Sequence, residues 1–101
     1  MGAVRYSPRA EDDLYDIAIY TLDHWGIAQA DLYIAGLEHF CDLLADSPRL
    51  GRPCHAIAPS LRRIEHQSHI IFFFPTDDGI LISRILYKGR DITDHAFAPS
   101  G

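Results

Sequence analysis

The sequence lacks any apolar run long enough to cross a membrane. Its longest uninterrupted apolar stretch, Ile70 to Phe74, is far shorter than the ~20 residues that a transmembrane helix requires. No basic and then apolar segment of the kind that begins a secretory signal precedes Ala3. We therefore expect a cytoplasmic protein that has no membrane partner.

Cysteine is also scarce. Two cysteines allow at most one bridge, and we expect Cys41 on the buried side of a helix and Cys54 in a loop. Both are therefore predicted to be free and reduced, as is usual in the cytoplasm.

Basic residues are few, and Lys88 is the sole lysine. Nine Lys and Arg residues stand against fourteen Asp and Glu residues, which gives a formal charge of -5. Because binding to a nucleic-acid backbone requires cations that displace counterions, this charge excludes broad attraction to RNA or DNA, and we expect no direct DNA binding. A local basic patch could still form from residues in the second half of the chain, namely Arg62, Arg63, Arg84, Lys88 and Arg90.

Six histidines raise the question of a metal site. His66 and His69 are three residues apart on adjacent predicted strand ends, and on a continuous strand they would point to opposite faces. The others lie on separate predicted elements: His24, His39, His55 and His95. We expect structural or solvent-facing roles for all six, with no metal and no other cofactor.

The composition that remains is that of one globular domain. The chain has 101 residues, of which 48% are apolar and 23% charged. We expect a single domain over residues 1–101, with its core at about residues 3–96 and a frayed tail at residues 97–101.

Two helices are predicted in the first half of the chain. Ser7 and Pro8 are typical of a helix start and Gly26 of a helix end, so the first helix spans about residues 8–24. A second stripe of residues at helical spacing follows almost at once: Ala30, Tyr33, Ile34, Leu37, Phe40, Cys41 and Leu44. The short connection predicts two helices packed back on each other.

Segments rich in β-branched and aromatic residues predict four strands. These are residues 4–6, 61–65, 68–74 and 80–87, with a loop at residues 49–59 and a turn at residues 75–79. The last two strands have apolar residues at both odd and even positions, whose side chains point to opposite faces. We therefore expect these strands in the centre of the sheet or covered on both faces. The order β-α-α-β-β-β predicts an α+β fold, in which a helical hairpin packs on one face of a mostly antiparallel twisted sheet.

Six features occur in a characteristic order along the chain. They are VRYSPRAEDDLYDI, YTLDHWGIAQADLYI, the SPRLGRP loop, SLRRIEHQSHIIFF, DDGILISRILYKGRD and a terminal acidic-His tail. In their order and spacing they resemble the ParE-type toxins of bacterial toxin-antitoxin modules, within the wider RelE/ParE superfamily. The resemblance covers about residues 3–96.

The resemblance implies a small toxin that is held inactive by a ParD-like antitoxin. Such antitoxins are usually ribbon-helix-helix DNA-binding proteins whose C-terminal segment wraps the toxin. ParE toxins are associated with inhibition of DNA gyrase, whereas their RelE-like relatives cut messenger RNA on the ribosome. Fold similarity alone does not choose between these two activities.

The ribonuclease alternative needs a proton acceptor, cations for the phosphorane and an acid for the leaving oxygen. Only Arg62, Arg63, Arg84 and Tyr87 could supply such a set, of which Arg62, Arg84 and Tyr87 are the candidates for catalysis. Arg84 and Tyr87 match the RelE-like positions loosely, and Tyr87 stands where ParE toxins commonly have His. The acidic net charge and the single lysine argue against docking onto ribosomal RNA. We therefore expect no catalytic residues, and protein-protein contact as the mode of action.

The segment RILYKGRD also has a structural interpretation. On a regular strand Ile80, Ile82, Arg84 and Leu86 share one face, and a single Arg among them often pairs with a carboxylate such as Asp91 or Glu65. The functional alternative is a basic rim that contacts an acidic antitoxin tail or gyrase.

Aromatic residues on the helical hairpin are further candidates for partner contact. Phe40 is expected in the core, whereas Tyr15 and Tyr20 lie off the buried stripe. The full set of candidates for antitoxin or target binding is Tyr15, Tyr20, Arg62, Arg63, Arg84, Tyr87, Lys88 and Arg90. A third hypothesis is a module that has lost its toxicity and remains as an antitoxin-bound co-repressor.

Overall fold

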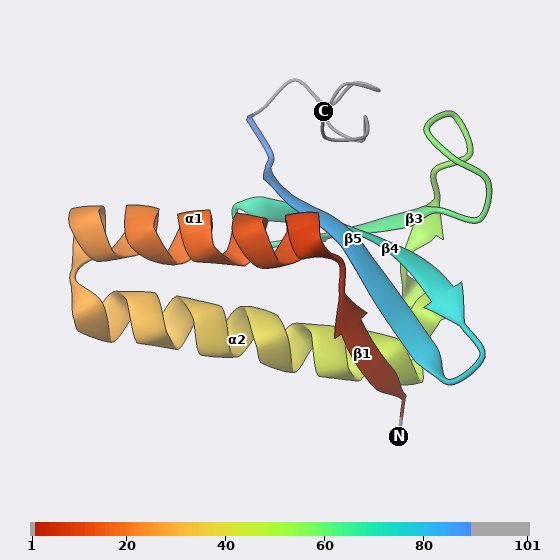
Figure 1. Ribbon diagram of the computed structural model, residues 1–101, viewed down its shortest axis with the longest axis horizontal. Coiled ribbons are helices and arrows are strands. Elements are labelled where there is room, and N and C mark those ends of the chain that lie inside the picture. The colour runs from red at the N-terminus through yellow and green to blue at the C-terminus, as the bar shows by residue number, and fades with distance from the viewer. Residues whose placement is uncertain (1, 90–101) are drawn as a thin grey trace.

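Two helices pack side by side against a five-stranded sheet in the computed structural model, which describes residues 2–89 (Figure 1). The elements are β1 (Ala3–Tyr6), α1 (Pro8–Trp25), α2 (Ile27–Asp46), the 3₁₀ helix η1 (Pro48–Leu50), β2 (Arg52–Pro53), β3 (Arg62–His66), β4 (His69–Thr76) and β5 (Gly79–Tyr87). The sheet order is β1-β5-β4-β3-β2. Only β1 and β5 run parallel, so the predicted α+β fold with a mostly antiparallel sheet is confirmed.

Helix α1 begins where the sequence predicts, at a capped N-terminus. The Ser7 hydroxyl accepts a hydrogen bond from the Ala10 N–H at 3.0 Å, and Pro8 occupies the first turn, where no N–H is needed. The helix ends at Trp25, and Gly26 adopts a φ of 90°, which favours glycine. This single residue reverses the chain into α2, so the two helices lie antiparallel (Figure 1).

Apolar clusters cover both faces of the central strands. The larger cluster lies between the helices and the sheet and includes Leu37, Leu44, Ile71, Phe73 and Ile82. The smaller cluster lies on the other face, where Leu61, Ile70, Phe72 and Leu86 pack beneath the segment that follows β2. The expectation that residues 68–74 and 80–87 form central strands covered on both faces is therefore confirmed.

A β-bulge changes which residues of β5 share a face. Phe72 pairs with Arg84 and Phe73 with Ile82, so Ser83 is an extra residue on β5. Ile82 therefore joins the helix-facing cluster, whereas Leu86 joins the cluster on the other face. The prediction that Ile80, Ile82, Arg84 and Leu86 share one face is wrong because it assumed an uninterrupted alternation.

Two local expectations were incomplete. The segment predicted as a loop at residues 49–59 contains η1 and β2, both too short to leave a periodic signal. Pro75 belongs to β4 and not to the turn, which consists of Asp77 and Asp78. The tail at residues 97–101, together with Arg90, Asp91 and His95, lies outside the described residues.

Two further expectations can be compared with the structure. Cys41 is buried, Cys54 is half-buried, and both are free, as predicted. Within residues 2–89, no helix combines the length and the apolar character needed to span a bilayer.

Ser7 should be a strong determinant of stability, since its side chain makes two hydrogen bonds. Besides capping α1, its hydroxyl donates to the Ser83 carbonyl at 2.8 Å. We expect Ser7→Ala to lower the free energy of unfolding by about 1–2 kcal/mol in urea denaturation. The matched control is Ser47→Ala, because Ser47 precedes η1 without a side-chain cap and should change stability by less than about 0.5 kcal/mol. Equal effects of the two substitutions would contradict this account.

Candidate functional site

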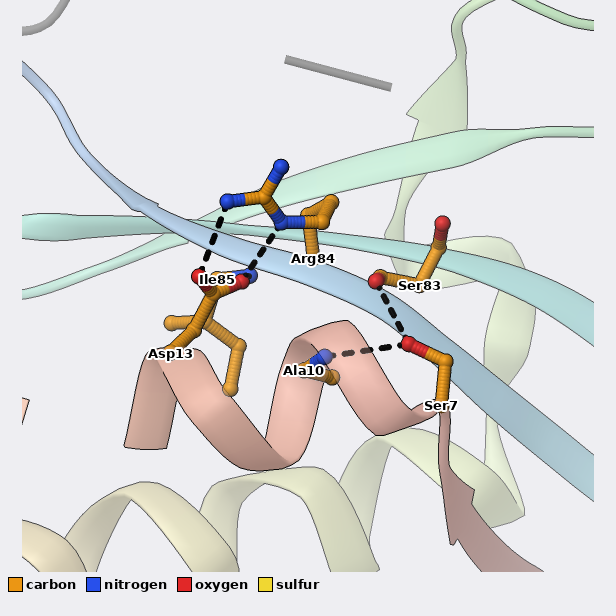
Figure 2. A network of polar contacts seen from close by, with 6 residues as sticks. All are labelled: Ser7, Ala10, Asp13, Ser83, Arg84 and Ile85. Atoms are coloured by element: carbon orange, nitrogen blue, oxygen red, sulfur yellow. Dashed lines mark hydrogen bonds and ion pairs between the residues drawn. The ribbon is translucent and has the colours of Figure 1, made fainter. Parts of the chain in front are cut away.

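A buried ion pair joins α1 to β5. Arg84 donates from Nε to Asp13 Oδ2 at 2.8 Å and from Nη2 to Asp13 Oδ1 at 2.9 Å, and the Ile85 N–H also donates to Asp13 Oδ2 at 2.9 Å (Figure 2). Arg84 is 6% exposed and Asp13 8% exposed. The hydrogen bonds to Asp13 raise the pKa of the Arg84 guanidinium above its ordinary value. Arg84 is thus a fixed cation that anchors the helix to the sheet.

The partner of Arg84 differs from those proposed from the sequence. Glu65 pairs instead with Lys88, at 3.4 Å, and Asp91 lies outside the described residues. Asp13 is 71 positions away in the chain and meets Arg84 because the α1 N-terminus crosses the edge of β5. The sequence offered no spacing rule that would have linked the two residues.

The residues of the ribonuclease alternative do not converge on one point. Arg84 forms its ion pair with Asp13, and Arg62 donates from Nε to the Gly51 carbonyl at 2.8 Å. Arg62 pairs across the sheet with Phe73, whereas Arg84 pairs with Phe72, so the two arginines leave the sheet on opposite faces. Tyr87 pairs with His69 at the far end of β5 and is 60% exposed.

An open cleft of about 980 Å³ lies between the helical hairpin and the ends of β4 and β5. Its lining includes Asp16, Tyr20, Trp25, Tyr33, His69 and Tyr87. Tyr20, Trp25 and Tyr87 are all largely exposed, and such amphipathic rings are enriched where proteins bind each other. Two predicted candidates, Tyr20 and Tyr87, are therefore brought together in this cleft.

The other candidates lie elsewhere. Tyr15 is exposed on α1 but does not line the cleft. Arg62 and Arg63 lie on β3, and the ion pair of Lys88 with Glu65 is exposed. Arg90 is outside the described residues. Phe40 is half-buried and packs against the main core, in agreement with its predicted role.

A histidine pair at the β3-β4 turn was misjudged from the sequence. His66 and His69 pair directly across a two-residue turn and so share a face, because they belong to two strands and not to one continuous strand. The Tyr33 hydroxyl lies 2.6 Å from His69 Nδ1, and the Phe40 ring lies 4.6 Å from the His66 ring. Burial lowers the pKa of both imidazoles, and the proximity of His66 lowers that of His69 further.

Metal and thiol chemistry find little support in the described part of the chain. Among residues 2–89 there is no group of three or more His, Cys, Asp or Glu side chains that could hold a metal ion. Burial raises the pKa of the Cys41 thiol to about 11, so it is not a thiolate nucleophile at neutral pH. The cleft itself is lined by aromatic and polar side chains.

The fold is also that of a solved toxin-antitoxin structure. A chain of the chromosomal ParDE TA system from P. aeruginosa superposes with a TM-score of 0.72 at 21% sequence identity, over 86% of this chain and 96% of that chain. At this identity the likeness defines the fold class alone: a helical hairpin on a mixed sheet.

Sequence comparisons define the family. The family described as the ParE toxin of the type II toxin-antitoxin system parDE matches residues 4–92. Toxin ParE1 of Mycobacterium tuberculosis is 37% identical over 87 residues, which cover 85% of this chain and 89% of that toxin. Toxin ParE1 of Caulobacter vibrioides is 30% identical over 95 residues, or 94% of this chain and 98% of that toxin. The chain therefore belongs to the ParE toxin family of type II toxin-antitoxin systems.

Removing the charge of Asp13 should destabilise the fold strongly. Asp13→Asn leaves Arg84 buried without a counter-ion, for which we expect a loss of about 3–5 kcal/mol in the free energy of unfolding, measured by urea denaturation. Asp12→Asn is the matched control, since Asp12 is exposed on the same turn and should change stability by less than about 0.5 kcal/mol. A small loss for Asp13→Asn would show that the ion pair is dispensable.

The histidine pair should make stability depend on pH. Because the folded-state pKa values of His66 and His69 lie below the ordinary 6.5, the folded protein binds fewer protons than the unfolded chain in acid. The stabilisation that the two neutral imidazoles contribute is therefore complete at a pH above 6.5 and is lost as the pH falls below 6.5. Urea midpoints measured at about pH 7.5 and about pH 5 should fall with pH, and His69→Gln should reduce the slope. His39→Gln, at an exposed histidine of α2, is the matched control for the substitution itself, and an equal change of slope in the two variants would contradict this account.

Proposed function

We propose that this ParE-family toxin acts by protein-protein contact, inhibits DNA gyrase in the cytoplasm and is neutralised by a ParD-like ribbon-helix-helix antitoxin. The observation that carries the non-enzymatic part is the Arg84-Asp13 ion pair, with both groups buried. A cation for phosphoryl chemistry must be free to meet the charge that develops on the substrate. The Arg84 guanidinium is instead paired with the Asp13 carboxylate inside the fold.

The remaining candidates support the same proposal. Arg62 donates a hydrogen bond to the Gly51 carbonyl and lies where β3 begins, beside Pro53. Tyr87 pairs with His69 at the opposite end of the strands, so the two side chains do not meet. The chain has a formal charge of -5, which disfavours docking onto an RNA surface. The exposed aromatic rings of the cleft, in contrast, suit contact with another protein.

The antitoxin part of the proposal rests on the family. The matching family is described as the toxin of parDE, and the solved structure with the same fold is that of a ParDE system. Toxins and antitoxins of one system are encoded together, so a short neighbouring reading frame for a ribbon-helix-helix protein would identify the partner.

Tyr87 is the observation that favours a second candidate function. It is exposed and stands where a RelE-like ribonuclease would place a terminal tyrosine. A RelE-like enzyme would cleave translated messenger RNA. A co-repressor without toxicity would neither cleave RNA nor inhibit gyrase, and it would leave growth unaffected.

Three measurements distinguish these functions. Induction without antitoxin should arrest growth, the purified chain should inhibit supercoiling by DNA gyrase, and primer extension on translated messenger RNA should show no new ends. Tyr87→Phe removes only a hydroxyl and should leave stability within about 0.5 kcal/mol of the parent, which makes it the matched variant. Cleavage of RNA that disappears in Tyr87→Phe would overturn the proposal in favour of the ribonuclease. Normal growth on induction would favour the co-repressor.

A further inference from the structure

Helix α2 carries apolar side chains on two opposite sides. One side packs into the main core through Leu37, Cys41 and Leu44. The residues of the other side are exposed, mostly apolar or small, and recur at helical spacing: Ala28, Leu32, Ala35, Gly36, His39 and Leu43. Leu32 is 68% exposed and Leu43 is 53% exposed. We call this side the leucine face, and because a helix that is apolar all round is typically buried, we expect a partner to cover it.

A row of carboxylates runs along one side of the leucine face. Asp31, Glu38 and Asp42 are all exposed, and their spacing places them on one side of the helix. None of the ion pairs within residues 2–89 includes any of the three. If two copies of α2 packed antiparallel about a two-fold axis, their carboxylate rows would lie side by side and repel each other. The charge of the leucine face therefore favours a cationic surface as its partner.

The chain itself carries such a surface, just beyond the end of α2. Residues 49–63 contain no acidic side chain and hold four arginines: Arg49, Arg52, Arg62 and Arg63. Arg52 pairs across the strands with Arg63, and none of the ion pairs within residues 2–89 includes either residue. Like charges placed directly opposite each other destabilise a sheet, and a carboxylate between them would relieve the repulsion. The β2-β3 edge is thus complementary in charge to the leucine face.

The surface beside these arginines is also hollowed. A recess of about 310 Å³ is lined by Leu50, Arg52, Arg63, Ile64 and Glu65. Leu50 is 65% exposed, and Lys88 pairs with the Glu65 carboxylate at 3.4 Å, which reduces the negative charge at this place. The recess therefore offers an apolar wall and two guanidinium groups to an incoming side chain.

We propose that copies of this chain associate head to tail, with the leucine face of one copy seated on the β2-β3 edge of the next. A leucine of that face enters the recess, and the carboxylate row beside it meets Arg52 and Arg63 through charge-assisted hydrogen bonds. The two contacting surfaces are different parts of the chain, so the contact is heterologous and builds rings or open chains larger than a dimer. This inference goes beyond the proposed function and does not depend on it.

The net charge of -5 does not prevent this contact. Two copies repel at long range, but at ~0.15 M salt charges that lie farther apart than about 8 Å are largely screened. At shorter range the carboxylate row faces arginines, so attraction prevails. A contact made by one helix face is smaller than a standard interface, and we expect a Kd on the order of 10–100 µM.

Sedimentation velocity on the full chain tests the contact. Between about 5 and 300 µM, the average mass of the parent should rise from that of one chain to more than that of two. The double variant Arg49→Gln/Arg52→Gln lacks two cations of the edge, and Glu38→Gln/Asp42→Asn lacks two anions of the row. Each should weaken association by about tenfold, since each removes two surface pairs. All four residues are exposed, so both variants should keep the helical circular dichroism of the parent.

A mixture of the two double variants gives the sharpest result. The variant without Glu38 and Asp42 keeps its arginines, and the variant without Arg49 and Arg52 keeps its carboxylates. One intact contact can therefore form between them, while the other surface of each chain lacks its charges. An equimolar mixture should form a 1:1 dimer at concentrations where each variant alone is a monomer, and it should not grow further.

Matched substitutions on α1 control for charge and for apolarity. Asp12→Asn/Asp23→Asn removes the same charge from exposed positions of α1 and should associate as the parent does. Leu43→Gln should weaken association, whereas Leu22→Gln, at a leucine of α1 that is 40% exposed, should not. Raising the salt from about 0.15 M to about 1 M should also weaken association, which a purely apolar contact would not show.

The outcomes separate this inference from the proposed function. A parent that stays monomeric at about 300 µM, double variants that associate as the parent does, or a mixture that stays monomeric would overturn the contact. A parent that stops at a dimer would overturn the head-to-tail arrangement. None of these results depends on growth arrest or on gyrase inhibition, so self-association and the proposed function can fail independently.

Discussion

The structure depends on the way that α1 closes the open edge of β5. Strand β1 pairs with β5 only as far as Ile82, and beyond that point the backbone of a central, buried strand would lack partners. Ser7 and Asp13 supply them. Ser7 donates from its N–H to the Ile82 carbonyl and from its hydroxyl to the Ser83 carbonyl, and the Asp13 carboxylate accepts a hydrogen bond from the Ile85 N–H. Because buried polar backbone groups must be paired, the start of α1 acts as the continuation of the β1 strand (Figure 2).

The Arg84 guanidinium provides the positive charge that allows the Asp13 carboxylate to be buried. A carboxylate buried at the edge of a sheet would be costly alone, and the Arg84 guanidinium neutralises it through two hydrogen bonds. The bulge at Ser83 alters the side-chain alternation next to Arg84, so one irregularity of the strand affects both the core and the ion pair. The residue that resembles a catalytic cation in the sequence is therefore a support for the junction of helix and sheet.

Because Arg84 is buried, two other regions stand out on the surface. The cleft beside α1 and β5 presents aromatic rings, and the β2-β3 edge presents arginines. This chain of the ParE toxin family therefore carries aromatic and cationic surfaces on different parts of one fold.

The sequence by itself determined the elements and the core. The cap at Ser7, the reversal at Gly26 and the apolar stripe around Leu37 are local signals, so the two helices, the three antiparallel strands and the buried Cys41 could be predicted from the residues. Only the tertiary structure decided which polar residues meet. The partner of Arg84, the shared face of His66 and His69 and the recess beside Arg63 depend on strand register, a bulge and a helix crossing. These relations join residues far apart in the chain or across a turn whose length the pattern does not reveal, and no periodicity encodes them.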